Sequence, residues 1–181
     1  MRHLRFLFRV LKDYKIGAFS VSSRYVAERI LREMPEGCRV VVEYGAGDGA
    51  ITKRLLRALP AGGRVVAIEQ NRELAAELRQ IADRRLTVIE DDILSVLRNP
   101  ARLGLREVDA VISGVPFSFF KKDAREEIIV RTSALLRRSG VFLVYQYSFL
   151  AFPTLKRFFR EVDVRFEPRN FLPYFIMVAA K

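Results

Sequence analysis

The chain has 181 residues, half of them apolar, and carries a net charge of +11 with a pI near 10.3. This length suits one domain with a buried core, and no apolar run approaches the roughly 20 residues of a membrane span. Cys38, the only cysteine, excludes an internal disulfide, and a single histidine argues against a metal site. The excess of cations favours a polyanionic partner, either nucleic acid or an anionic membrane surface.

Residues 1–16 are expected to form a basic amphipathic helix, because apolar side chains recur there at helical spacing beside a stripe of cations. Such a helix either lies in a membrane interface or covers the core of its own domain, and the two roles are compatible. Tracking RNA phosphates is a less natural role for so aromatic a segment. The residues expected to bind a membrane are Arg2, Arg5, Phe6, Phe8, Arg9 and Lys12.

The rest of the chain, residues 17–181, is expected to be a single α/β domain. It begins with a linker in which Ser22 or Ser23 could cap the following helix, predicted over 24–34. No repeat, low-complexity segment or second domain is visible in the sequence.

A glycine-rich turn follows the first buried strand, which is predicted over 40–43. Gly45, Gly47 and Gly49 stand at every second position, and helical spacing resumes after them. This GxGxG spacing differs from the GxGxxG of dinucleotide sites, which place a pyrophosphate on a helix N-terminus. Glu43 would repel a pyrophosphate but could hold an ammonium. The pattern fits a cofactor with an amino acid head and an adenosine tail, such as S-adenosylmethionine, and a plain tight turn is the alternative.

Three further buried strands are predicted, over residues 63–68, 86–89 and 108–112. Glu69 closes the first of them, where α/β nucleotide sites put a carboxylate on the ribose hydroxyls. The acids at 90–92 follow the second strand, and the turn from Ser113 to Phe117 follows the third. Each acid could instead cap or begin the next helix. Because the carboxyl ends of parallel strands meet at one edge, these turns together indicate a cofactor crevice.

The alternation of helices and strands continues to the C-terminus. The expected elements are helices over 71–82, 91–97 and 121–138, a polar connection over 99–107, a strand over 141–147, an aromatic and basic segment over 149–159 broken by Pro153, and strands over 161–166 and 174–180.

The segments EYGAGDGA, AIEQN and EDDIL and the serine-proline turn, in this order, resemble the successive motifs of class I S-adenosylmethionine-dependent methyltransferases. The resemblance covers about residues 38–150. It implies a Rossmann-like, seven-stranded, mostly parallel sheet with helices on both faces and a C-terminal antiparallel hairpin. Within that superfamily the chain is most similar to bacterial phospholipid N-methyltransferases, which are relatives of the ribosomal RNA adenine dimethyltransferases. The narrower likeness rests on Gly17-Ala18, Ser22-Ser23, the turn over 112–116 and residues 170–173.

The resemblance and the strand ends together nominate the site residues. Cofactor binding is expected of Glu43, Gly45, Ala46, Gly47, Glu69, Gln70, Asp92 and Ile93. The acids would hold the amino acid end, the ribose and the adenine edge of the cofactor, in that order. Substrate contacts are expected from Ser22, Ser23, Pro116, Phe117 and Tyr145, and catalytic roles from Ser113, Gly114 and Tyr147.

The methyl acceptor could be a lipid amine or the N6 amino group of an adenine. A lipid amine must lose a proton from an ammonium, which a polar and partly desolvated pocket would favour, with Ser113, the Gly114 carbonyl and two tyrosines as candidates. An adenine N6 acceptor needs different groups. The resembling RNA enzymes use an Asn/Asp/Ser-Pro-Pro-aromatic or Asn-Leu-Pro-aromatic motif, whose first side chain and proline carbonyl accept from the amino group of the flipped base. Here Gly114-Val115-Pro116-Phe117 begins with glycine, which has no side chain to accept with.

The expected function is transfer of methyl groups from S-adenosylmethionine, leaving S-adenosylhomocysteine, to the amino headgroup of a phospholipid of the phosphatidylethanolamine type. The expected place is the cytoplasmic surface of the inner membrane, because the arginine-rich start lacks the cleavage site of a secretory signal. The alternatives are an RNA adenine N6-methyltransferase and a non-catalytic lipid- or RNA-binding module. Intact acids at Glu43, Glu69 and Asp92 argue against the module. The expected partners are an anionic membrane and its phospholipid, without metal, and the chain is expected to be monomeric.

Overall fold

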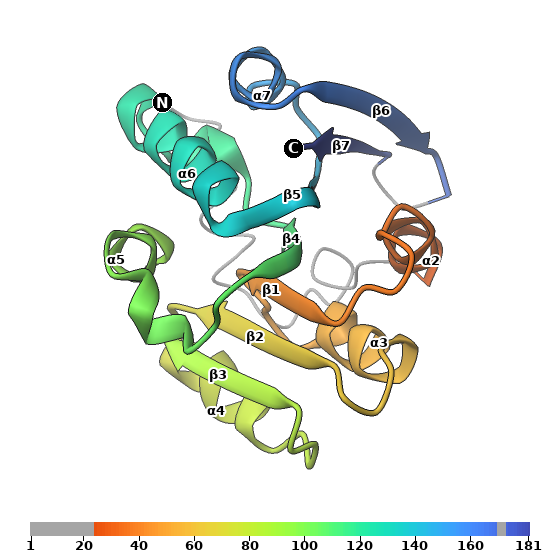
Figure 1. The fold of residues 1–181 in the computed structure, drawn as a ribbon, viewed down its shortest axis with the longest axis vertical. Coiled ribbons are helices and arrows are strands. Elements are labelled where there is room, and N and C mark those ends of the chain that lie inside the picture. Colours follow the sequence, from red (N-terminus) through yellow and green to blue (C-terminus); the bar gives the residue numbers. More distant parts are fainter. Residues whose placement is uncertain (1–23, 170–172) are drawn as a thin grey trace.

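The computed structural model describes residues 24–169 and 173–181. Its centre is a seven-stranded sheet in the order β3-β2-β1-β4-β5-β7-β6 (Figure 1). The strands are β1 (Val40–Tyr44), β2 (Arg64–Glu69), β3 (Leu86–Glu90), β4 (Val108–Ser113), β5 (Leu136–Gln146), β6 (Glu161–Glu167) and β7 (Tyr174–Ala180). The first five strands pair in parallel, whereas β7 runs antiparallel to both β5 and β6. The expected Rossmann-like sheet with its C-terminal hairpin is confirmed.

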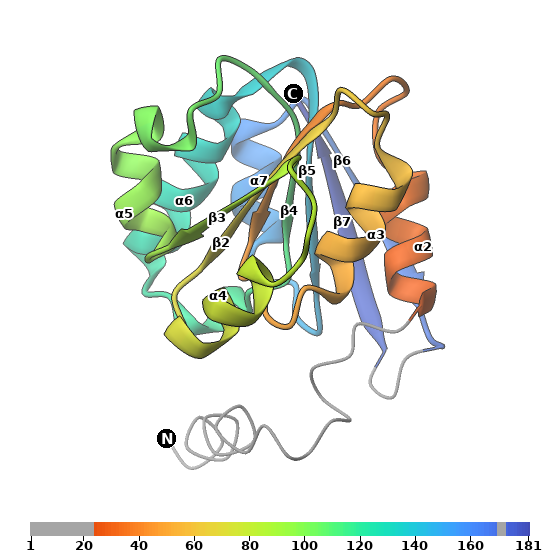
Figure 2. The same ribbon diagram turned by 90° about the horizontal axis from the view of Figure 1, so that it is seen from below.

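Helices cover both faces of the sheet (Figure 2). They are α2 (Arg24–Arg32), α3 (Ala50–Ala58), α4 (Arg72–Arg79), α5 (Ile93–Arg98), α6 (Lys122–Leu135) and α7 (Phe152–Phe158), with short 3-10 turns η1 (Pro100–Leu103) and η2 (Phe117–Phe119). One face carries α2, α3 and α4, and the other carries α5, α6 and α7. Because both faces are covered, the central strands are continuous apolar runs, as in other parallel sheets.

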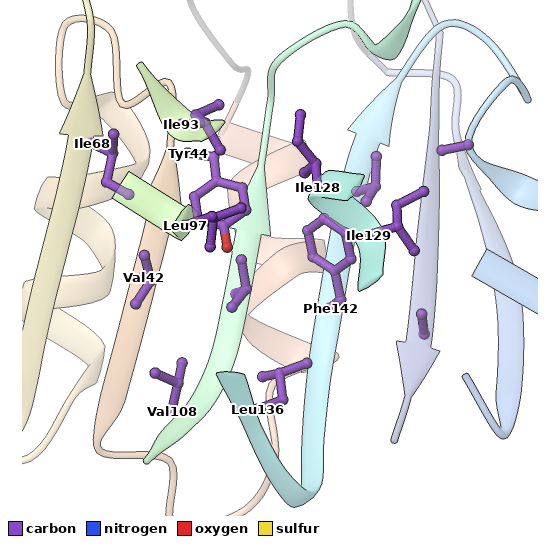
Figure 3. Packing of buried hydrophobic residues seen from close by; sticks show 14 of the residues in the cluster. Val42, Tyr44, Ile68, Ile93, Leu97, Val108, Ile128, Ile129, Leu136 and Phe142 are labelled. Carbon is purple, nitrogen blue, oxygen red and sulfur yellow. The ribbon is translucent and has the colours of Figure 1, made fainter. Parts of the chain in front are cut away.

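The larger core lies between the sheet and the second helical layer. Tyr44 and Phe142 pack there with their ring centroids 6.1 Å apart, close to Ile128 and Leu97 from the covering helices (Figure 3). The buried Tyr44 hydroxyl forms a 3.0 Å hydrogen bond with Oγ1 of Thr132. This rigid layer fixes β1 and β4, whose carboxyl ends lead into the predicted site.

The helix predicted over 121–138 is shorter than expected. It ends at Leu135, and Leu136 already pairs with Val108 at the start of β5, before a register shift in the β4–β5 ladder. The guanidinium of Arg137 forms a salt bridge with Asp109 of β4. Tertiary pairing therefore overrides the good helix-forming tendency of this leucine- and arginine-rich stretch.

Two other expectations change in detail. The polar connection over 99–107 contains a 3-10 turn anchored by the buried Leu103, so it is not a purely solvated surface. Pro153 lies in the first turn of α7 and does not break that helix, because its missing N–H would have no helical acceptor there.

The expected helix over 1–16, the hydroxyls of Ser22 and Ser23 and residues 170–172 lie outside the described residues. Within the described part of the chain, no helix combines the length and the apolar character needed to cross a bilayer.

Candidate active site

The carboxyl ends of β1, β2 and β4 meet at one edge of the sheet, where Tyr44 is in register with both Ile68 and Ser113. The glycine turn closes onto this edge, since the Gly45 N–H donates to the carbonyl of Ile68 at 2.8 Å. Gly45 has a φ of 67°, and a side chain there would overlap Val115. Only glycine therefore allows the β1 and β4 turns to approach this closely.

Gly47 has a different environment in the same turn. Its φ is 57°, and a Cβ built on it would meet no heavy atom within 4 Å. The backbone is thus bare on this side of the turn, which is the condition for a ligand to lie directly against it.

The Glu69 carboxylate joins the glycine turn to the helix that follows β2. Its two oxygens accept hydrogen bonds from the N–H groups of Gly47 and Asn71, each at 2.9 Å. Each carboxylate oxygen has a second lone pair, so the group can also accept from hydroxyls of a ligand. The predicted ribose contact requires this arrangement, in which the carboxylate accepts and the ribose hydroxyls donate.

Glu43 is 1% exposed and accepts a 2.5 Å hydrogen bond from Oγ1 of Thr52 on α3. Burial raises the pKa of Glu43 to about 8, although the Thr52 hydroxyl favours the ionised form. A ligand ammonium would stabilise the carboxylate in the same way. Thr52 is a further candidate site residue, and nothing in the local spacing of the sequence relates it to Glu43.

The remaining predicted cofactor residues lie at the neighbouring strand ends. Asp92 is exposed and caps α5, with Oδ1 accepting from the N–H groups of Leu94 at 2.9 Å and Ser95 at 3.2 Å. Ile93 is buried beside it, and Gln70 is exposed after β2. Capping and an adenine contact are compatible, since Asp92 keeps a second carboxylate oxygen.

These groups fit S-adenosylmethionine. The edge combines a bare backbone at Gly47 with carboxylates for an ammonium and for two hydroxyls. The buried Oγ of Ser113 has no hydrogen-bond partner among the described residues, which leaves it for a ligand. No group of three or more His, Cys, Asp or Glu residues in the described chain could hold a metal ion.

Gly114 and Tyr145 lie together at the part of this edge where the methyl acceptor is expected, which we call the acceptor side. A Cβ on Gly114 would overlap the Tyr145 hydroxyl oxygen. The tyrosine hydroxyl therefore occupies the space that a side chain at position 114 would need. The sequence shows that position 114 offers no side chain, but only the structure shows that a neighbouring strand provides a hydroxyl in its place.

Two further tyrosines extend the acceptor side. The Tyr147 and Tyr174 rings stack with centroids 4.4 Å apart, and their hydroxyls form a 2.6 Å hydrogen bond. The Tyr174 ring also meets Tyr145 edge to face at 5.8 Å. Burial raises the pKa of both Tyr147 and Tyr174, so their hydroxyls stay neutral at physiological pH. We call Tyr145, Tyr147 and Tyr174 the tyrosine cluster. Tyr174 was not among the predicted site residues.

The turn after β4 is held by Gln146, a further residue without a predicted role. Its Oε1 accepts from the Phe117 N–H at 3.0 Å, and its Nε2 donates to the Ser148 carbonyl at 2.8 Å. The Phe117 ring is 1% exposed and packs near Phe142, so it supports the turn from the core side and does not face the open edge. Pro116, just before it, is partly exposed.

Comparisons with known proteins agree with this geometry. The family model described as "Methyltransferase domain" matches residues 41–140. A protein of Singulisphaera acidiphila named ornithine lipid N-methyltransferase is 32% identical over 168 residues, which are 87% of this chain and 84% of that protein. Ribosomal RNA small subunit methyltransferase A of Acidobacterium capsulatum is 46% identical over 84 residues, 45% of this chain and 28% of that protein.

A solved structure shares the fold. Precorrin-6y C5,15-methyltransferase of Geobacter metallireducens superposes with a TM-score of 0.71 at 20% identity, over 91% of this chain and 93% of that one. The comparisons confirm an enzyme that uses S-adenosylmethionine, while the roles of individual site residues stay predictions. The chain belongs to the class I S-adenosylmethionine-dependent methyltransferases and is a relative of the lipid N-methyltransferases.

Proposed function

We propose that this enzyme methylates the amino group of a membrane lipid headgroup at the membrane surface. The headgroups to compare are phosphatidylethanolamine, which the sequence resemblance implies, and ornithine lipid, on which the relative from Singulisphaera acidiphila acts by its name. The observation that carries the proposal is the tyrosine cluster beside Gly114, which replaces the accepting side chain expected of a base methylase.

The cluster suits an aliphatic amine because methylation places a positive charge on the acceptor nitrogen. The bound cofactor supplies a methyl group carried on a positively charged sulfur. A tyrosine ring attracts a cation to its face, and a tyrosine hydroxyl can orient an N–H bond. Tyr147 is the most exposed of the three rings and is the one that we expect to meet the amine. A partly desolvated setting lowers the pKa of the amine, which favours the neutral form that accepts the methyl group. Tyr147 and Tyr174 stay neutral, so we assign the cluster orientation and not removal of the proton.

The test is methyl transfer from labelled S-adenosylmethionine to three acceptors side by side: phosphatidylethanolamine vesicles, ornithine lipid vesicles and protein-free ribosomal RNA. We expect label in a lipid fraction. Tyr145→Phe should lower kcat by about ten- to hundredfold while leaving cofactor affinity within about twofold, because one orienting hydroxyl is lost. Tyr25→Phe, which removes a tyrosine hydroxyl on α2, is the matched control and should keep full activity. Label in RNA alone would refute the proposal.

The partial identity to a ribosomal RNA methyltransferase supports RNA as the second candidate acceptor. The net charge of +11 is compatible with both polyanions. The glycine at position 114 favours the lipid amine over RNA. A flipped adenine would need a hydrogen-bond acceptor for its amino group, and glycine has no side chain to provide one. The hydroxyl of a tyrosine on β5 would have to take that role.

A further inference from the structure

Exposed apolar side chains gather at one end of the sheet. Among the residues that the structure describes, five large apolar side chains are exposed. Phe149, Leu150 and Phe166 are 45%, 48% and 51% exposed, and Tyr147 lies next to them at 39%. The fifth, Val130, is also 39% exposed but lies within α6. Four of the five therefore lie in one region. Exposed apolar side chains that are scattered singly over a surface need no explanation, but a group of them marks a surface of interaction.

These side chains form one continuous surface. Gln146, at the carboxyl end of β5, is opposite Phe175 at the start of β7, and Phe166 of β6 pairs with Phe175 from the other side. The Phe175 ring centroid lies 4.2 Å from that of Phe149 and 5.4 Å from that of Phe166. We call Phe149, Leu150, Phe166 and Phe175 the aromatic edge.

Cations flank the aromatic edge. Nζ of Lys156 lies 5.5 Å from the centroid of the Phe152 ring, which in turn meets Phe149 at 6.2 Å. Lys121 and Lys122 are exposed where the chain leaves the turn after β4 and begins α6. Aromatic side chains bordered by lysines are typical of surfaces that insert into the interface of an anionic membrane.

The aromatic edge also borders the acceptor side of the active site. Tyr147 lies two residues before Phe149 in the chain and stacks on Tyr174, while Phe175 follows Tyr174 directly on β7. Tyr174 and Phe175 point to opposite faces of the sheet, because consecutive residues of a strand alternate. The aromatic edge and the tyrosine cluster therefore lie at the same end of the sheet, on its two faces.

We propose that the aromatic edge docks the enzyme on an anionic phospholipid bilayer. Phe149, Leu150 and Phe166 enter the boundary between headgroups and acyl chains, and the flanking lysines lie against headgroup phosphates. Docking in this orientation brings a lipid amine to the tyrosine cluster while its acyl chains stay in the bilayer. The inference rests on the proposed function only in taking a lipid as the acceptor, and it adds a contact separate from the helix expected over 1–16.

The first experiment uses the absence of tryptophan from the chain. Leu150→Trp and Val130→Trp, each in the full-length protein, place a single fluorophore on the aromatic edge or on α6. The vesicles contain phosphatidylglycerol and phosphatidylcholine brominated in the acyl chains. We expect lipid to shift the Leu150→Trp emission to the blue and quench it, and to leave Val130→Trp unchanged. Absence of quenching at Leu150→Trp, or equal quenching of both, would overturn the proposal.

The second experiment measures binding. Phe149→Ser combined with Phe166→Ser should weaken flotation with phosphatidylglycerol vesicles by about tenfold or more, because two exposed rings no longer leave water on docking. Val130→Ser is the matched control and should bind like the wild type. Unchanged binding of the double variant contradicts the proposal. A change in the oligomeric state of the double variant without vesicles would assign the aromatic edge to a second copy of the chain and also overturns it.

The two proposals fail in distinguishable ways. If Leu150→Trp is quenched but the wild type methylates no lipid amine, docking stands and the proposed function falls. If lipid is methylated but Leu150→Trp is not quenched, docking falls and the function stands. With a short-chain lipid below its micelle concentration, the double serine variant should keep wild-type activity, since that substrate needs no docking.

Discussion

Glu43 shows how one residue couples the stability of the protein to its ligand. A carboxyl group whose pKa is about 8 in the fold and 4.5 ordinarily holds its proton more tightly in the folded state. Its contribution to stability is complete below pH 4.5 and is lost as the pH rises through about 8. A carboxylate this deeply buried is thus retained at a cost to the unliganded protein, which an ammonium ligand would offset.

Glu43→Gln should therefore stabilise the unliganded protein and weaken its cofactor binding. We expect similar thermal unfolding of wild type and variant near pH 4.5, and a higher Tm for the variant at pH 8. The gain in unfolding free energy there should be on the order of a few kcal/mol. The dissociation constant for S-adenosylmethionine, measured by calorimetry, should rise about ten- to hundredfold, because a charge-assisted hydrogen bond is lost. Glu36→Gln, at an exposed position, is the control; equal pH profiles for wild type and Glu43→Gln would contradict this account.

At the scale of an element, two glycines make it possible to distinguish the effect of backbone strain from the effect of ligand contact. Gly47 and Gly104 both have left-handed φ values, 57° and 63°, and both have open space where a Cβ would stand. They differ in place: Gly47 faces the predicted cofactor site, whereas Gly104 ends the η1 turn. Alanine at either position meets the same backbone strain.

Gly47→Ala and Gly104→Ala should each lower the free energy of unfolding by about 1–2 kcal/mol in denaturant titrations. Only Gly47→Ala should also weaken binding of S-adenosylmethionine, by about tenfold or more, because its methyl group takes the space of the ligand. Equal cofactor affinity in the two variants would mean that the bare backbone at Gly47 is not part of the site.

At the scale of the whole molecule, the net charge of +11 and the aromatic edge should act through different forces. Attraction of cations to an anionic bilayer is screened by salt, whereas burial of aromatic rings is not. Both the helix expected over 1–16 and the lysines near α6 and α7 should contribute to the first force.

Binding of the wild type to phosphatidylglycerol vesicles should weaken by about tenfold between 0.1 and 0.5 M NaCl in a flotation assay. The Phe149→Ser and Phe166→Ser double variant should start weaker and keep the same salt dependence. Cofactor affinity, measured at both salt concentrations, is the control and should change little. Wild-type binding that does not respond to salt would show that apolar insertion alone holds the protein to the membrane.

Local pattern in the sequence was enough for the framework of the fold. Buried strands, the glycine turn and the acids at the ends of β1, β2 and β3 depend on residues within a few positions of one another, so spacing alone predicts them. The failures were of another kind. The stretch after Leu135 has helical propensity, yet the ion pair of Arg137 with Asp109 and the pairing of Leu136 with Val108 draw it into β5.

The sequence by itself thus determined the succession of strands and helices along the chain and the class of cofactor, and it predicted a site at the carboxyl ends of the strands. Only the tertiary structure decided which distant side chains meet there: Thr52 with Glu43, Tyr145 with Gly114, Tyr174 with Tyr147, and Phe175 with Phe149. The last three contacts exist because β5 lies between β4 and the antiparallel β7. The turn after β4, the end of β5 and the start of β7 therefore lie at the same edge of the sheet. No local period encodes that pairing, since it follows from how the whole sheet buries its two faces.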